Sequence, residues 1–151
     1  MGENVKEMSA DGFTPLLLAV RGGHTETCEL LLSNGSDLEE KVLVTKRSAL
    51  HLASADGHSS LLQLLIDHRG DVNSRDITGG TPLHFASQEG HLSCVAMLLQ
   101  AGADPLMPDK TGALSIHHSA SLNHHRVVHF FIEQGRCSPN QVKDTPPVNR
   151  A

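Results

Sequence analysis

Residues 81–99, TPLHFASQEGHLSCVAMLL, contain three features that recur along the chain. Thr-Pro-Leu opens the stretch, a Gly-His pair follows with its histidine ten residues after the threonine, and an apolar triplet closes it. Matching stretches begin at Thr14, Ser48 and Leu114, so the four copies are spaced by 34, 33 and 33 residues. Three features in register across four copies indicate an array of four repeated units.

Each copy is expected to form two short helices. Threonine is a good N-cap and proline suits the first helical position, so the Thr-Pro pair starts the first helix. The glycine before each histidine ends that helix, since glycine adopts the left-handed conformation at little cost. The second helix carries apolar residues at helical spacing, for example at Leu61, Leu62 and Leu65. Two short helices cannot bury their apolar faces alone, so we expect neighbouring units to stack.

The Thr-Pro-Leu-x-x-Ala pattern of residues 14–19 and 81–86, with the Gly-His pairs and the LLLSNG ending at 30–35, resembles the ankyrin repeat. The resemblance implies an all-α ankyrin-repeat solenoid of four helix-turn-helix units joined by β-turn fingers. We assign an N-terminal tail at 1–8, repeats at 9–42, 43–75 and 76–108, a degenerate fourth repeat at 109–141, and a flexible C-terminal tail at 142–151.

The second and fourth units depart from the repeated pattern. Lys46 stands where a turn glycine is expected, and Arg69 where the exit glycine is expected. Because left-handed backbone strains a residue such as arginine, we expect Gly70 to adopt that geometry instead. One extra residue within 35–48 predicts a longer turn. Asn123 replaces the glycine that ends the first helix of the fourth unit, and asparagine tolerates the left-handed region.

The composition excludes several classes of protein. The chain has 151 residues, a net charge of −5 and a mean hydropathy of −0.20. The mild acidity argues against a nucleic-acid partner, which needs clustered lysine and arginine, and no apolar stretch is long enough to span a membrane. No signal peptide is visible, and three distant cysteines form no disulfide framework, which favours the cytoplasm or the nucleus. Cys28 and Cys94 are expected in the core and Cys137 at the surface.

Eleven histidines raise the question of a metal site. Seven occupy repeated positions, where the resemblance implies hydrogen bonds to backbone between units: His24, His51, His58, His84, His91, His117 and His124. His68, His118, His125 and His129 remain, and the last two are spaced to share one helix face as a metal-binding pair. This pair lacks a third ligand, so we assign no metal, no cofactor and no catalytic residue. A metal-binding or enzymatic protein that uses the histidines of the fourth unit is the alternative function.

The resemblance implies a non-catalytic protein-protein interaction module, that is an adaptor, scaffold or regulatory subunit, which binds another protein through the concave face of the array. In this family the contacts come from the finger tips and the exposed side of the first helices. Carried over by register, the partner-binding residues are Phe13, Arg21, Val42, Val44, Thr45, Arg47, Ala55, Asp56, Ile77, Thr78, Gln88, Glu89, Lys110, Thr111, Ser121 and Leu122. The end units resemble internal ones, so further ankyrin repeats or self-association at the ends are also expected.

Two segments carry sharper hypotheses. Residues 41–47, KVLVTKR, place three apolar residues where the family usually has Asp, Asn and Gly. Either they form an apolar tip flanked by cations that binds an acidic and apolar peptide, or Val42 and Leu43 fold under the loop and cover the neighbouring turn. The segment 65–73, LIDHRGDVN, resembles ankyrin sites of the asparaginyl hydroxylase, with Asn73 as the residue for hydroxylation. The structural alternative is that Asn73 only makes turn hydrogen bonds.

Overall fold

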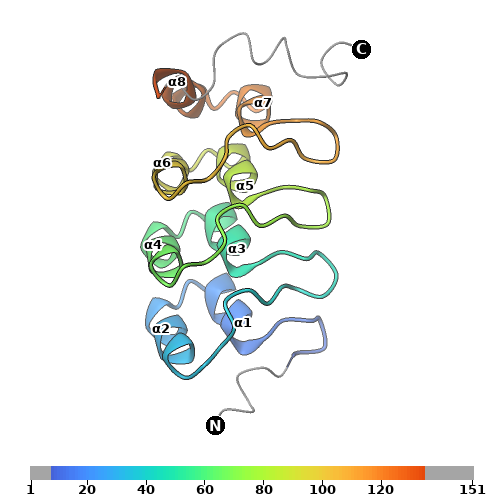
Figure 1. Ribbon diagram of the computed structural model, residues 1–151, viewed down its shortest axis with the longest axis vertical. Helices are drawn as coiled ribbons and strands as arrows, with labels where there is room; N and C mark the ends of the chain where they lie inside the picture. Colours follow the sequence, from blue (N-terminus) through green and yellow to red (C-terminus); the bar gives the residue numbers. More distant parts are fainter. Residues whose placement is uncertain (1–7, 135–151) are drawn as a thin grey trace.

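The computed structural model describes residues 8–134, which form eight helices and no strand. The odd-numbered helices make one layer and the even-numbered helices a second, with finger-like loops projecting beyond the odd-numbered layer (Figure 1). This arrangement confirms the predicted all-α solenoid of helix pairs. The helices are α1 (Pro15–Arg21), α2 (Thr25–Ser33), α3 (Ala49–Asp56), α4 (Ser59–Asp67), α5 (Pro82–Gln88), α6 (Leu92–Gln100), α7 (Ser115–Ser121) and α8 (His125–Glu133).

Parts of the sequence-based assignment lie outside the described residues. These are the C-terminal tail at 142–151, the end of the fourth repeat, Cys137, and all of the N-terminal tail at 1–8 except its last residue. Among residues 8–134, no helix combines the length and the hydropathy that crossing a membrane requires.

The first helix of each unit begins where the sequence predicts. The Thr14 hydroxyl accepts a hydrogen bond at 3.2 Å from the backbone N–H three residues later, and proline follows it as the first residue of α1. Ser48 and Thr81 cap α3 and α5 in the same way. Leu114 has no side-chain oxygen, and its backbone N–H instead donates to the His117 ring at 2.7 Å. The fourth helix pair therefore keeps its start without the usual hydroxyl cap.

The core lies between the two layers. Leu16, Leu50, Leu83 and Ile116 occupy the same position in the four first helices, and none is more than 2% exposed. The predicted burial of Cys28 and Cys94 in the second helices is confirmed, and burial raises the pKa of each thiol to about 11. A thiol with so high a pKa is almost entirely protonated at neutral pH, so it acts as a small apolar side chain.

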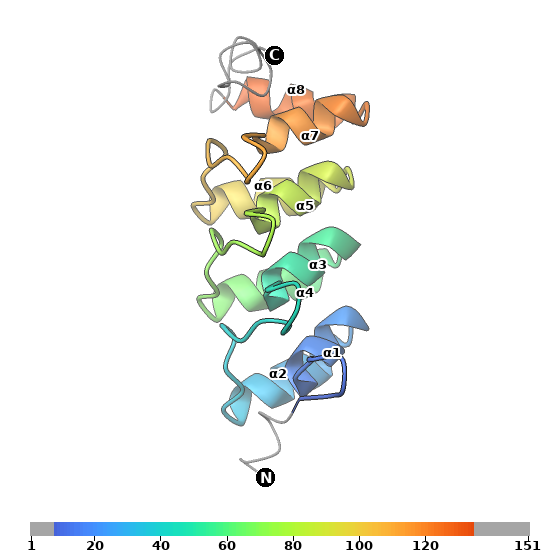
Figure 2. The same ribbon diagram turned by 90° about the vertical axis from the view of Figure 1, so that its right-hand side faces the viewer.

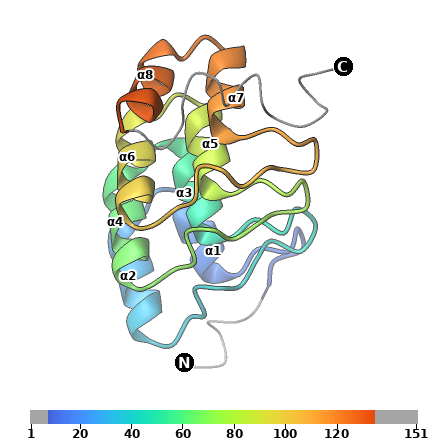
Figure 3. The ribbon, with the colours of Figure 1, turned by 45° about the horizontal axis from the view of Figure 1, so that its top comes forward.

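The fingers stack on one another through backbone hydrogen bonds. Ile77 N donates to Thr45 O at 2.9 Å, and Lys110 N donates to Thr78 O at 3.0 Å. These bonds join the second finger to the third and the third to the fourth, and Figures 2 and 3 show the fingers following one another along the same side of the array. Each finger tip is therefore positioned by its neighbour as well as by its own turn.

The extra residue of the second unit lies in its finger. The bond that closes this finger joins Val42 N to Arg47 O at 2.8 Å, five residues apart, whereas Asp76 N and Gly80 O, four residues apart, close the third finger. Val42 thus takes the place of the aspartate, and its side chain is only 3% exposed. Its assignment to the partner-binding surface was wrong, because this finger position points into the core.

The expected role of Gly70 was also wrong. Arg69 itself adopts the left-handed conformation, with φ 67°, in register with Gly35 and Gly102 at φ 98° and 100°. Gly70 is needed for space, since an added Cβ would lie 2.4 Å from Leu50 Cδ1 and 3.2 Å from a backbone oxygen. Asn123, at φ 63°, does take the left-handed position after α7 as predicted.

These two adjacent positions make a matched pair for unfolding experiments. Gly70→Ala should lower the free energy of unfolding by about 1–3 kcal/mol, because its methyl group overpacks the core against Leu50. Arg69→Gly should raise it by about 1 kcal/mol, because glycine removes the left-handed strain. Urea unfolding followed by circular dichroism measures both, and equal effects at the two positions would contradict this assignment of strain and space.

Candidate partner-binding surface

The predicted partner-binding residues divide by exposure. The exposed ones are on finger tips and at the ends of the first helices: Arg21, Val44, Asp56, Ile77, Thr78, Glu89, Lys110, Thr111, Ser121 and Leu122. A second group is half-buried: Phe13, Thr45, Arg47, Ala55 and Gln88. The fingers and first helices that carry both groups lie on the side of the array away from the even-numbered helices (Figure 1).

The second and third finger tips expose three large apolar side chains, which we call the apolar ridge. Leu43, Val44 and Ile77 are 57%, 70% and 52% exposed. The bond from Ile77 N to Thr45 O holds the two tips side by side. Val42 is therefore buried, as one hypothesis for residues 41–47 expects, whereas the tip beyond it is apolar and exposed, as the other expects. Leu43 belongs to the ridge although it was left out of the predicted surface.

The Arg47 side chain contacts the next unit, so it is less available to a partner than its predicted role requires. Its Nε lies 3.5 Å from Asp76 Oδ2, and its guanidinium lies over the Phe85 ring, 4.5 Å from the ring centroid. Asp76 is in the next finger and Phe85 in the next first helix, so this side chain bridges two units. A partner would meet the more exposed cations Lys46 and Lys110 on the tips instead.

Buried histidines join the first helices to the following fingers. The His51 ring accepts a hydrogen bond from Ser48 N at 3.0 Å through Nδ1, and its Nε2 donates to Gly80 O at 2.9 Å. Burial lowers the pKa of His51 to about 4. The carboxylate of Asp76 opposes this shift, whereas the cations Lys41 and Arg47 add to it. His51 is therefore neutral at pH 7 and works as a structural hydrogen-bonding group.

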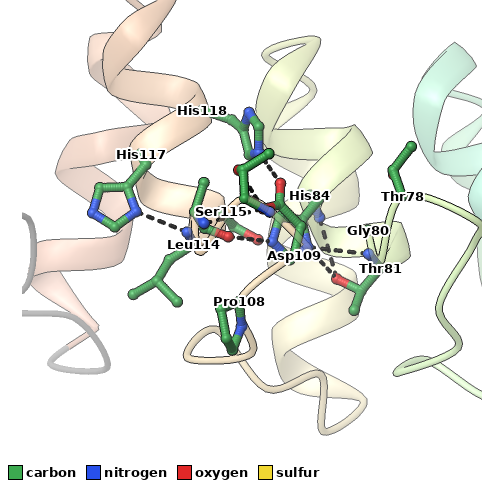
Figure 4. A network of polar contacts seen from close by, with 12 residues as sticks. Thr78, Gly80, Thr81, His84, Pro108, Asp109, Leu114, Ser115, His117 and His118 are labelled. Atoms are coloured by element: carbon green, nitrogen blue, oxygen red, sulfur yellow. Dashed lines mark hydrogen bonds and ion pairs between the residues drawn. The ribbon is translucent and has the colours of Figure 1, made fainter. Parts of the chain in front are cut away.

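The same arrangement recurs one unit later (Figure 4). Thr81 N donates to His84 Nδ1 at 3.0 Å, and His84 Nε2 donates to Ala113 O at 3.0 Å. Burial lowers the pKa of His84 as well. His91 and His124 also contact the preceding unit, through carbonyl oxygens at 3.1 and 2.8 Å. For these four residues the expected backbone hydrogen bonds between units are confirmed.

Within residues 8–134, His125 and His129 are not joined by a third side chain in a group that could hold a metal ion. His125 and His129 are exposed on α8, and His129 Nε2 lies 3.1 Å from Glu133 Oε2 one turn further along. His118 lies elsewhere, with its Nε2 2.8 Å from Asp109 Oδ2. Burial acts to raise the pKa of Asp109, but hydrogen bonds from Thr111 and His118 outweigh it, so the pKa falls to about 2.

Asn73 is half-buried in the turn after α4. Its side-chain oxygen accepts a hydrogen bond from Asp104 N at 2.9 Å, and its own N–H donates to Asp71 Oδ1 at 3.0 Å. The side-chain bond joins this turn to the following unit, and only the backbone bond lies within the turn itself. Hydroxylation of Asn73 stays a prediction, for which mass spectrometry of the peptide from cells should find one added oxygen atom; an unmodified peptide would contradict it.

The pKa of His51 predicts a pH-dependent stability. Its ordinary pKa is near 6.5 and its folded pKa is about 4, so the unfolded chain binds the proton more readily. The contribution of neutral His51 to the free energy of unfolding is about 3 kcal/mol. It is fully present above pH ~6.5 and is lost as the pH falls towards ~4. Urea unfolding across this range should show the loss. His51→Gln should flatten the profile, while the control His68→Gln at an exposed site should not; a profile unchanged by His51→Gln would contradict the assignment.

Comparison with known proteins connects this architecture to a family. The chain is 34% identical over 80 residues to the ankyrin repeat and KH domain-containing protein mask of Drosophila melanogaster, covering 52% of this chain and 2% of that protein. It is 35% identical over 71 residues to Inversin of Gallus gallus, covering 47% of this chain and 6% of that protein. The chain therefore spans a small part of the length of these relatives.

Models of protein families also match this chain, and together they cover a longer stretch of it than these relatives do. The model for ankyrin repeats in three copies matches residues 34–109, and the single ankyrin-repeat model matches residues 11–41. The first match alone covers 76 of the 151 residues. With its stacked helix pairs, hydroxyl caps on three of the four first helices and bonded fingers, this chain belongs to the ankyrin-repeat family.

Proposed function

We propose that this chain is a non-catalytic interaction module that binds a partner protein across the tips of its second and third fingers. Ankyrin repeats generally mediate binding to other proteins. The observation that carries the proposal is the apolar ridge of Leu43, Val44 and Ile77, each more than half exposed. Large apolar side chains held open on adjacent rigid fingers offer contact area that only a partner can cover.

The charges around the ridge indicate the chemistry of the partner. Lys46 and Lys110 are exposed on the second and fourth fingers, on either side of Ile77. The chain as a whole has a net charge of −5, so these tips differ in sign from the overall charge. An extended partner segment that combines apolar anchors with aspartate or glutamate would match both features.

We also propose that the chain acts as an adaptor, scaffold or regulatory subunit in the cytoplasm or nucleus. The alternative is a metal-binding or enzymatic protein that uses the histidine cluster of the fourth unit. Of that cluster, His125 and His129 are exposed on α8, and within residues 8–134 they belong to no group of three side chains that could hold a metal ion, which favours the interaction module over a site at this pair.

Site-specific photo-crosslinking tests the proposal. A photoreactive amino acid at Val44 in the full chain should capture a partner in cells, and the captured peptide should contain acidic and apolar residues. The matched control is the same amino acid at Leu30, an apolar residue of α2 that is 63% exposed outside the finger surface.

A second change locates the contact. Ile77→Asp should reduce the yield from Val44 by at least about tenfold, because it places a carboxylate in the apolar contact and repels an acidic segment. Leu30→Asp should leave that yield unchanged. Crosslinking that is equal from Val44 and Leu30, or that survives Ile77→Asp, would move the binding surface away from the ridge.

A further inference from the structure

The junction between the third and fourth units gathers two histidines and an aspartate (Figure 4). One donor atom from each of His84, Asp109 and His118 lies within 4.8 Å of the other two. His118 Nε2 is 2.8 Å from Asp109 Oδ2, and the two imidazole rings meet edge to face with centroids 5.5 Å apart. Two imidazoles and a carboxylate are a donor set that divalent transition-metal ions accept.

The junction between the second and third units has the same framework but lacks the second histidine. There His51 and Asp76 hold the places of His84 and Asp109, and the neighbouring ring is Phe85, whose centroid is 5.5 Å from that of His51. The second carboxylate oxygen of Asp76 faces the cation Arg47. At the later junction His118 replaces the phenylalanine. Within the described part of the chain, the same framework therefore carries a third donor only between the third and fourth units.

The carboxylate and the buried ring are already held in place. Asp109 Oδ1 accepts three hydrogen bonds, from Thr111 N at 2.9 Å, from the Thr111 hydroxyl at 2.6 Å and from Ala113 N at 3.0 Å. Oδ2 is left for His118. The Nδ1 of His84 accepts from Thr81 N inside the helix cap, so Nε2, which donates to Ala113 O at 3.0 Å, is the nitrogen outside the cap. Outer bonds such as those to Asp109 orient metal ligands.

We propose that His84 Nε2, Asp109 Oδ2 and His118 Nε2 bind one divalent transition-metal ion, with Zn²⁺ as the probe that fits the donor set. In a tetrahedral site with bonds of about 2.0–2.2 Å, donor atoms lie about 3.3–3.6 Å apart. His118 and Asp109 separate slightly from 2.8 Å to meet this, and His84 moves inward. The side chains of His118 and Asp109 are 28% and 10% exposed, so the ion enters from solvent and keeps a water as fourth ligand.

Binding exchanges some hydrogen bonds for metal bonds. His84 gives up the bond from Nε2 to Ala113 O and takes its other neutral tautomer. Its Nδ1–H then donates to the Thr81 hydroxyl, which lies 2.9 Å away. The bond that Nδ1 accepted from Thr81 N is lost as well, so Thr81 N–H and Ala113 O must each find another partner, such as water. The bond between His118 and Asp109 is replaced by their shared ion. Because these exchanges oppose binding, we expect micromolar rather than tighter affinity.

Titration of the untagged full chain with Co²⁺ and Zn²⁺ tests the site. Co²⁺ should give the visible absorption of a low-symmetry site at one ion per chain, and Zn²⁺ should displace it. His118→Phe should weaken binding by at least about tenfold, because it keeps the ring that the preceding junction has and removes the nitrogen ligand. The double variant His125→Ala, His129→Ala should bind as tightly as the wild type.

A second variant keeps the test decisive if His118→Phe unfolds. Asp109→Asn retains an amide oxygen for the turn hydrogen bonds and should also weaken binding by at least about tenfold. In NMR spectra of the wild type, Zn²⁺ should shift the ring nitrogens of His84 and His118 and leave those of His125 unchanged. Absence of saturable binding, or binding that the double variant on α8 abolishes, would overturn the proposal.

Discussion

The apolar face of each helix pair can be covered only by another pair, and the rest of the array depends on this constraint. Burial of the first helices against one another and against the second layer supplies the non-directional attraction. The buried histidines make it specific. His51 and His84 each connect a helix cap to a carbonyl oxygen of the following finger, at Gly80 and Ala113. Because an unpaired buried ring nitrogen is costly, units stack at the spacing that satisfies these bonds.

The sequence predicted what depends on short-range chemistry. Hydroxyl caps at Thr14, Ser48 and Thr81, and the left-handed Asn123, follow from properties of single residues and their near neighbours. The failures concern side chains that are distant in the sequence and pack against a residue in the fold. Gly70 is explained by the Leu50 side chain that packs on it, which no local pattern shows.

The candidate sites show the same difference between local features, which the sequence predicts, and contacts made by the fold, which it does not. Residues 41–47 were recognised as unusual, but only the closing bond of the finger shows that Val42 turns inward. Helical spacing drew attention to His125 and His129, whereas the cluster at His84 combines residues of two units that no linear motif relates. Stacking geometry, rather than local sequence, brings such side chains together.

The bonds between fingers also have a mechanical consequence. Each junction within residues 8–134 has one such bond between tips, at 3.3 Å from Leu43 N to Gly12 O, 2.9 Å from Ile77 N to Thr45 O, and 3.0 Å from Lys110 N to Thr78 O. Since units contact only their neighbours, these junctions act as springs in series along the long axis. Tension applied to the ends of the array would therefore load all three junctions together.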